Sequence, residues 1–400
     1  MQKLYTVDSE CCGCSACEAV CPVNIIKMEI NEEGFFYPNI YNEKNCIQCG
    51  LCKKVCPMKR KDISQNFSKQ IFAAVSNNQD IWESSSSGGI FTEICQSLKI
   101  ENPVIFGASW DGLNVIMDYS DGLDDICKFR KSKYVIANPN GMFQKVKEYL
   151  NLGRFVIFSG TPCQINGLNL FLNKKSEKLL TIDFACHGQG SKIIFDKWIE
   201  YLERTNKRKV IGFSFREKRR LKDHINSNCC SYVLENGDKI IENRDYYHHA
   251  YVNGLCMRKS CADCQFANHR LSDITLADFK NLKNGLPDYE EIRNVSTVIA
   301  NTDKGKMVIN KLNNISKFEV DGEFVYRYNP KLVKGLPGNP QRDNFMNDVI
   351  VLNKDVSKTI KRYAKISLKE KVEYNCSTKA YRILAPVMGI FDKIINKLKR

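Results

Sequence analysis

The sequence predicts a small α+β module at the amino terminus, followed by a larger α/β domain with a mostly parallel sheet. Two observations predict this division. Nine of the 19 cysteines fall within residues 11–56, in a pattern that occurs twice. After a polar segment at residues 61–70, strand-like and helix-like segments alternate, which is typical of α/β domains. We therefore expect domains at residues 1–62 and 68–345 and a basic helical tail at residues 346–400.

Charge and hydropathy narrow the class of protein. The 400 residues carry 60 Lys and Arg against 45 Asp and Glu, a formal net charge of +15. Residues 361–400 alone hold eleven basic and three acidic residues, so this segment contributes +8. The uneven charge predicts a basic tail and no nucleic-acid surface. We see neither a signal peptide nor an apolar run of the roughly 20 residues that a membrane span needs, so we expect a cytoplasmic protein.

The cysteines of the first module form two motifs offset by 35 residues. The spacing Cys-x2-Cys-x2-Cys-x3-Cys-Pro begins at Cys11 and again at Cys46, and Cys12 lies outside the repeat. This is the spacing of bacterial ferredoxins with two 4Fe-4S clusters, in which the fourth cysteine of each motif ligates the other cluster. A disulfide scaffold or a zinc site gives no reason for such a repeat. The expected ligand sets are Cys11, Cys14, Cys17 and Cys56 for one cluster, and Cys46, Cys49, Cys52 and Cys21 for the other.

The large domain shows four apolar strands, each followed by a helical run. The expected strands are residues 71–76, 103–110, 155–160 and 179–186, and the expected helices are residues 90–99, 141–152, 164–174 and 192–205. Ligands of such sheets bind beyond the carboxyl ends of the strands.

Three loops in this domain carry candidate chemistry. SSSSGGIF, residues 84–91, opens a helix, and it is either a phosphate-accepting site or a plain helix cap. SGTPCQ, residues 159–164, places Cys163 in the first turn of a helix, where the dipole favours a thiolate. ACHGQGS, residues 185–191, places Cys186 beside His187. Either cysteine could instead be an ordinary buried residue.

A further Cys-x2-Cys pair, Cys261 and Cys264, is half of a cluster site. Joined with Cys163 and Cys186, it gives the four thiols that a third cluster needs. The spacing does not settle which thiols meet, since Cys229, Cys230 and Cys256 could serve equally well.

Four phrases occur in order and together resemble a known family: RKSKYVIANPNG, VIFSGTPCQINGL, DFACHGQGS and SCADCQFANHRLSDITLADF. The chain resembles the coenzyme F420 hydrogenase/dehydrogenase beta-subunit family, in the branch with an amino-terminal two-cluster ferredoxin module. The resemblance extends from residue 1 to about residue 300. It implies an FAD- and 4Fe-4S-dependent oxidoreductase that passes electrons between clusters, flavin and a small molecule. An electron-transfer subunit that serves a partner enzyme is the alternative.

The resemblance also assigns roles to individual residues. It implies that Cys163, Cys186, Cys261 and Cys264 ligate the third cluster. It places Arg130, Lys131, Ser132 and Lys133 where a phosphate or acidic substrate would dock, and Asp273 and Asp278 after the Cys-x2-Cys pair. The expected cofactor contacts are Ser85, Ser86, Ser87, Gly88, Gly89, Gly160, Thr161 and Lys133.

Two further residues bear on the chemistry. His187 is the candidate proton donor beside a flavin, although a hydrogen-bonded loop histidine is an equal alternative. The family often has a tryptophan after Gly-Asp-Phe, whereas this chain has Lys280 after Ala277-Asp278-Phe279, which puts the use of coenzyme F420 in question.

The last 22 residues, 379–400, place apolar residues at helical spacing opposite lysine and arginine. Such a helix can lie on an anionic membrane surface. It can equally pack its apolar stripe on the protein or on a partner, and we favour this second interpretation.

Overall fold

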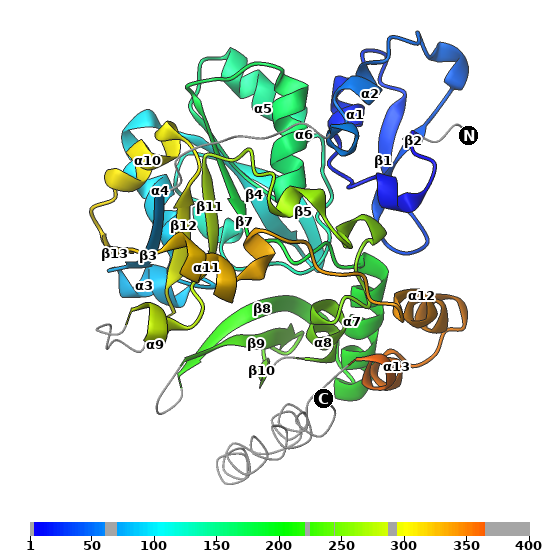
Figure 1. The fold of residues 1–400 in the computed structure, drawn as a ribbon. Coiled ribbons are helices and arrows are strands. Elements are labelled where there is room, and N and C mark those ends of the chain that lie inside the picture. The colour runs from blue at the N-terminus through cyan, green and yellow to red at the C-terminus, as the bar shows by residue number, and fades with distance from the viewer. Residues whose placement is uncertain (1–3, 61–69, 221–224, 244, 287–293, 365–400) are drawn as a thin grey trace.

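The computed structural model describes residues 4–60, 70–220, 225–243, 245–286 and 294–364. Its amino-terminal module contains two short helices, α1 (Ala16–Val20) and α2 (Leu51–Lys54), and an antiparallel hairpin of β1 (Ile26–Ile30) and β2 (Phe36–Ile40). Figure 1 shows this module at one side of the larger domain, next to the helices α5 and α6.

The duplicated cysteine motifs also repeat their backbone conformation. Gly13 and Gln48 both have positive φ angles, of 69° and 52°. Two residues further on, Ser15 and Gly50 have φ angles of 68° and 70° and cap α1 and α2. These four positions are related by the same offset of 35 residues as the cysteines. Left-handed backbone turns the loop tightly and points successive amides inward, as a bound cluster requires.

The larger domain is built on an eight-stranded sheet of order β13-β3-β12-β11-β7-β6-β4-β5. The four central strands, β11, β7, β6 and β4, are parallel, and the strands on both flanks are antiparallel. The α/β class is thus confirmed, with the parallel pairing at the centre of a mixed sheet. The strands are β3 (Gln70–Ser76), β4 (Val104–Asp111), β5 (Asn114–Asp121), β6 (Val156–Ser159), β7 (Leu179–Phe184), β11 (Ile274–Asp278), β12 (Ser296–Ala300) and β13 (Ile315–Glu319).

Helices cover both faces of this sheet. α4 (Ile90–Ser97) and α10 (Asp303–Asn310) pack on one face. α5 (Met142–Asn151) and α6 (Pro162–Leu172) pack on the other. The short helices α3 (Gln79–Glu83), α9 (Leu282–Gly285) and α11 (Gly322–Tyr328) lie near the edge formed by β3 and β13. The central strands are buried between these layers, which explains why their sequences read as continuous apolar runs.

The amino-terminal module shares a hydrophobic core with α5 and α6. Cys14, Ala16 and Val55 belong to the same buried cluster as Phe143 and Leu168. Gly167, in the middle of α6, leaves no space for a side chain, because a Cβ there would lie 2.8 Å from the Cys14 sulfur. The cysteine loop therefore packs directly on the backbone of α6.

A second sheet, of order β10-β9-β8, lies below the first in Figure 1. It consists of β8 (Val210–Arg220), β9 (Ile225–Leu234) and β10 (Lys239–Asn243). Its core partners are the helices α7 (Lys192–Asn206), α8 (Tyr246–Val252), α12 (Arg342–Met346) and α13 (Val356–Tyr363). Residues 342–364 thus pack into this core. The amphipathic helix expected at residues 379–400 lies outside the described residues. No helix within the described ranges has the length and apolarity to cross a membrane.

Candidate functional site

A cavity of about 540 Å³ opens where the central parallel strands end. All three predicted loops line it, at Ser85–Ser87, Ser159–Thr161 and Ala185–Gln189. Gly13 of the amino-terminal module lines it as well. The position agrees with the expectation that α/β sheets bind ligands beyond the carboxyl ends of their strands. Its volume lies within the range of cofactor sites.

The serine-rich loop is held in place by buried hydrogen bonds. The amide of Gly88 donates to the Ser296 hydroxyl at 2.9 Å. A Cβ on Gly88 would lie 2.4 Å from the carbonyl oxygen of Ala74, so only glycine fits there. Gly89, with a φ angle of 87°, then caps α4. The hydroxyl of Ser86 accepts a hydrogen bond of 2.8 Å from the Ser132 amide, which joins this loop to the next one.

The basic loop, residues 130–133, forms one wall of the cavity. Lys133 donates to three carbonyls, those of Lys128, Arg130 and Lys131, at 2.9 to 3.2 Å. Burial, and then Lys131, lower the pKa of Lys133 to about 7, whereas its three carbonyl acceptors favour the protonated form. Because its donors are occupied, Lys133 shapes the loop and leaves ligand contacts to its neighbours. Arg130, which lines the cavity, donates to the Ser84 hydroxyl at 2.6 Å.

The start of α6 also lines the cavity. Thr161 caps the helix and exchanges hydrogen bonds with Gln164. The Thr161 hydroxyl also lies 3.1 Å from the Cys163 sulfur. A side chain on Gly160 would lie 2.9 Å from the ring of Phe158, so glycine keeps this wall close to the strand.

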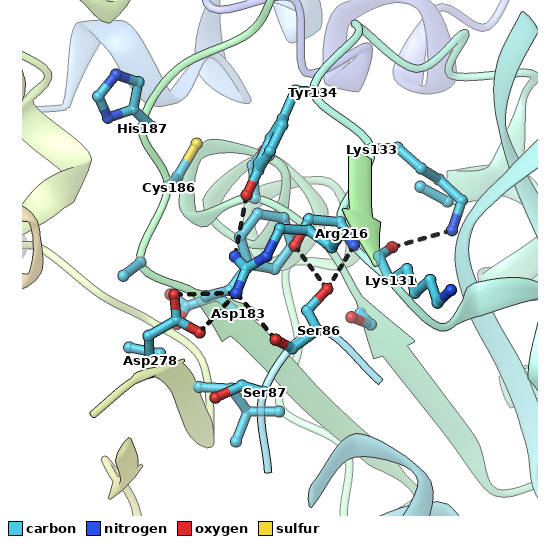
Figure 2. Close-up of a pocket in the computed structure, with 18 of the residues that line it drawn as sticks. Ser86, Ser87, Lys131, Lys133, Tyr134, Asp183, Cys186, His187, Arg216 and Asp278 are labelled. Carbon is cyan, nitrogen blue, oxygen red and sulfur yellow. Dashed lines mark hydrogen bonds and ion pairs between the residues drawn. The ribbon is translucent and has the colours of Figure 1, made fainter. Parts of the chain in front are cut away.

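Arg216, on β8, occupies the centre of the site (Figure 2). Its guanidinium donates to the Ser86 carbonyl at 2.9 Å, to the Tyr134 hydroxyl at 3.1 Å and to the Asp278 carboxylate at 3.3 Å. Burial alone would raise the pKa of Asp278, but Arg216 and Lys280 lower it to about 2. Lys280 thus pairs with Asp278, which leaves a compact ionic group at the base of the cavity. Asp273, by contrast, is used in the structure of the sheet, where it accepts from Thr181.

His187 lies at the other end of the cavity, away from Arg216 (Figure 2). Its Nε2 lies 3.0 Å from the Val252 carbonyl, which can only accept, so the proton sits on Nε2. Nδ1 is buried and has no hydrogen-bond partner among the described residues. Burial, and then Lys331, lower the pKa of His187 to about 4. The side chain is therefore neutral near pH 7, with Nδ1 free to accept a hydrogen bond, and a role of His187 as proton donor stays a prediction.

The amino-terminal cysteines group across the two motifs. Burial raises the pKa of the Cys17 thiol, and the neighbouring Cys11 and Cys56 raise it further. Burial likewise raises the pKa of Cys52, which has Cys49 and Cys21 as thiol neighbours. Each group joins cysteines of one motif with the fourth cysteine of the other. Cys17 also has Cys52 of the other set as a neighbour, so the division into two ligand sets stays a prediction.

None of the described cysteines forms a disulfide. Among the same residues, no three side chains of the usual ligand types meet closely enough to hold a metal ion. A 4Fe-4S cubane is larger than an ion and spreads its thiolates further apart, so thiols that are neighbours without converging on one point fit a cubane.

The large domain brings together a thiol group of its own, the second thiol group, which consists of Cys163, Cys186, Cys261 and Cys264. Burial raises the pKa of Cys186, and the neighbouring thiols of Cys261, Cys163 and Cys264 raise it further. The amide of Gln189 points at the Cys261 sulfur, at 3.3 Å. The rival thiols lie elsewhere, because Cys229, Cys230 and Cys256 are buried against or within the core of the second sheet.

The family comparisons agree with this geometry. Residues 153–323 match the sequence model for the C-terminal part of the coenzyme F420 hydrogenase/dehydrogenase beta subunit. This segment is similar to that family. Residues 10–59 match the 4Fe-4S dicluster domain. The resemblance inferred from the motifs is confirmed, and the chain is an iron–sulfur redox protein related to a hydrogenase/dehydrogenase beta subunit.

A solved structure shows a more distant likeness to this beta-subunit-like chain. It is a chain of the F420-reducing [NiFe] hydrogenase complex from Methanosarcina barkeri, with 15% sequence identity and a TM-score of 0.43. The match covers 74% of the present chain and 89% of the other. No curated protein matches the chain.

The segment that matches the beta-subunit family contains Gly160, His187 and the cysteine group of the large domain. The serine-rich loop and residues 130–133 precede it and line the same cavity. Sequence reasoning missed Arg216, the residue that joins these parts. Alternation places Arg216 on the face opposite the buried Phe213 and Phe215, so the strand pattern gave no signal that its side chain is buried.

Proposed function

We propose that this chain is an iron–sulfur flavoprotein oxidoreductase. FAD binds in the 540 Å³ cavity, and the chain moves electrons between its 4Fe-4S clusters, the flavin and a small-molecule substrate or coenzyme. One observation carries the proposal: a single cavity touches Gly13 in the first cysteine loop, Cys186 in the second thiol group and the serine-rich loop.

The lining of the cavity fits a dinucleotide. Besides Lys133, whose donors are occupied, five cations line it, against the two carboxylates of Asp183 and Asp278. The five are Arg130, Lys131, Arg216, Lys280 and Lys331. The excess of positive charge complements a pyrophosphate. The buried Nδ1 of His187, which lacks a partner in the described structure, offers an acceptor to a ring N–H at the other end.

We assign separate roles to the cavity residues and to the cysteines. Arg130 and the backbone near Ser86 hold the phosphate end, and Arg216 fixes the floor of the cavity. The two four-cysteine sets of the first module and the set Cys163, Cys186, Cys261 and Cys264 hold three clusters. When bound, clusters and flavin together supply one-electron transfer and its conversion to two-electron chemistry.

Anaerobic purification with iron and flavin quantitation tests the proposal. Three clusters and one flavin require about twelve irons and about one FAD per chain. About eight irons without flavin would leave only the first module in place, and the proposal would be wrong for the large domain.

One observation favours the alternative of an electron-transfer subunit. The loop around the second cysteine motif is exposed, and Ile47, between Cys46 and Gln48, is 60% exposed. Residues 41–60 carry five basic residues and one acidic residue. Such a surface suits a protein partner. Turnover of a small molecule by the isolated chain would separate the oxidoreductase from the subunit.

A further inference from the structure

Arg258 is a buried cation at the boundary between the two thiol groups. It follows α8 in the large domain, three residues before Cys261. Its side chain is 1% exposed. The guanidinium leaves the large domain and reaches into the first cysteine loop of the amino-terminal module.

The guanidinium contacts the backbone and the sulfur of Cys11. Nε donates to the Cys11 carbonyl at 2.9 Å, and Nη2 lies 3.6 Å from the Cys11 sulfur. Nη2 also donates to the Phe36 carbonyl at 2.9 Å. The group lies over the ring of Tyr37, 3.9 Å from its centre. These contacts fix the guanidinium against the cysteine loop.

The cysteine loop is shaped to admit this side chain. A Cβ on Gly13 would lie 2.7 Å from Nη1 of Arg258, so a larger residue would displace the guanidinium. Gly13 is thus needed twice, for its positive φ angle of 69° and for the approach of Arg258.

No carboxylate within the described ranges forms an ion pair with Arg258. A buried charge without a counter-charge is strongly destabilising. The ionisable neighbours of Arg258 are thiols and a phenol: Cys11, Tyr37, Cys12 and Cys261. Thiolates, which are the form that ligates iron, are the available counter-charges.

Gln189 continues the contact into the thiol group of the large domain. Its side-chain amide donates to the Cys12 carbonyl at 3.1 Å, and its backbone amide donates to the Cys261 sulfur at 3.3 Å. Its side-chain oxygen lies 3.5 Å from Nη1 of Arg258. Arg258 and Gln189 therefore form one polar junction between Cys11 and Cys261.

We propose that Arg258 is a positioning residue. Its buried charge, which comes from the large domain, raises the reduction potential of the cluster bound through Cys11. The inference rests on the proposed function, because it takes the thiol groups as cluster ligands. Reduction adds one negative charge to a cluster, and a fixed buried cation stabilises that charge. The gain or loss of one electron balances without proton transfer.

Anaerobic redox titration of the full-length holoprotein, followed by electron paramagnetic resonance, tests this inference. Arg258→Gln removes the charge and keeps a side chain of similar polarity. We expect the midpoint potential of one cluster to fall by about 59 mV or more. For one electron, this corresponds to a tenfold change in the ratio of reduced to oxidised forms. Arg258→Lys keeps the charge and should retain most of the native midpoint.

Arg342→Gln is the matched control. Arg342 lies 6.0 Å from the Phe35 ring, and Arg258 lies 5.8 Å from the same ring. Arg342 pairs with Glu33, and the thiol on which its charge acts is Cys256, which is in none of the expected ligand sets. Its substitution should shift no midpoint by more than a third of the Arg258→Gln effect.

The outcomes separate this inference from the function on which it rests. Unchanged midpoints in an Arg258→Gln protein with its full iron content would overturn the inference alone. Loss of iron in Arg258→Gln but not in Arg258→Lys would support it, since the thiolates then need the charge. Equal loss in both variants would show a role in packing and overturn it. A native protein without clusters would refute the proposed function itself.

Discussion

The amide of Ser132 donates a hydrogen bond of 2.8 Å to the hydroxyl of Ser86, and this contact ties together two loops that are 46 residues apart. Both residues line the cavity. Ser86→Ala removes the bond and frees the basic loop. Since one hydrogen bond contributes about 1 kcal/mol, we expect about fivefold weaker FAD binding. Flavin fluorescence quenching measures the affinity. Ser97→Ala, at the end of α4, is the control, and an equal loss there would contradict the assignment.

The thiol group of the large domain predicts a fixed change in iron content. Cys264→Ser removes one of its four sulfurs, so the protein should lose about four irons and keep about eight. Cys127→Ser changes an exposed cysteine outside every group and should lose none. Colorimetric iron assay on anaerobic preparations gives the answer. If Cys264→Ser kept the native iron content, Cys264 would not be a ligand.

Arg216 is expected to contribute strongly to stability. Its substitution by methionine leaves the Asp278 carboxylate without its main partner in a buried site. Breaking a buried pair costs about 3 to 5 kcal/mol of unfolding free energy. Arg204→Met breaks the more exposed pair with Asp355 and should cost less than about 1 kcal/mol. Urea unfolding followed by tryptophan fluorescence compares the two, and similar costs would rule out the central role of Arg216.

Lys331 predicts a pH dependence of anion binding. Burial, and then Lys280, lower the pKa of Lys331 to about 8 from its ordinary value near 10.5. A bound anion favours the ammonium, so binding takes up a proton and the affinity should fall as the pH rises through 8. In the ligand-free protein, the unfolded state binds more protons between pH 8 and 10.5, so this group makes stability rise with pH in that window.

Calorimetric titration with ADP as the anionic probe, at about pH 7 and about pH 9, measures the effect. The native protein should bind more tightly at the lower pH, and Lys331→Met should lose most of that difference. Equal affinities of the native protein at both pH values would show that Lys331 does not face the anion.

The exposed loop of the second cysteine motif predicts the approach of an acidic electron donor. Lys53 and Lys54 are exposed next to Cys52. Charge-complementary partners associate faster at low salt. Reduction of the protein by an acidic one-electron carrier should therefore slow in the double variant Lys53→Gln and Lys54→Gln. Lys99→Gln, on the large domain, is the matched control, and stopped-flow traces at two salt concentrations compare them. Equal rates in all three proteins would exclude this surface.

The sequence predicted the elements whose pattern is local. The four apolar strands and the four helical runs occur within about two residues of their expected limits, because continuous apolar segments and N-cap residues such as Thr161 and Ser191 mark them directly. The cysteine repeat was likewise visible in the sequence, because its two motifs have the same spacing at an offset of 35 residues. The order of the strands was not accessible. β3 lies between β12 and β13, which follow it by more than 200 residues, and only long-range packing decides such neighbours.

The candidate site was predictable to a similar extent. The loops at Ser85–Ser87 and Gly160–Thr161 line the cavity because each follows or opens an element whose position was clear. Arg216 was missed because its strand has no motif. Arg258 was missed because the motif beside it, Cys261-x2-Cys264, is defined by its cysteines alone. Their importance comes from burial, which depends on the neighbours that the fold brings to them.

Helix α6 carries Cys163 in its first turn and Gly167 one turn later, where its backbone meets Cys14. One helix thus fixes the position of the amino-terminal module relative to Cys163 in the large domain. The two parts cannot be exchanged freely with those of relatives, since a foreign module would need the same recess opposite this glycine. Chimaeras should be designed with the breakpoint beyond α6, so that α6 and the cysteine loop that packs on it come from the same protein.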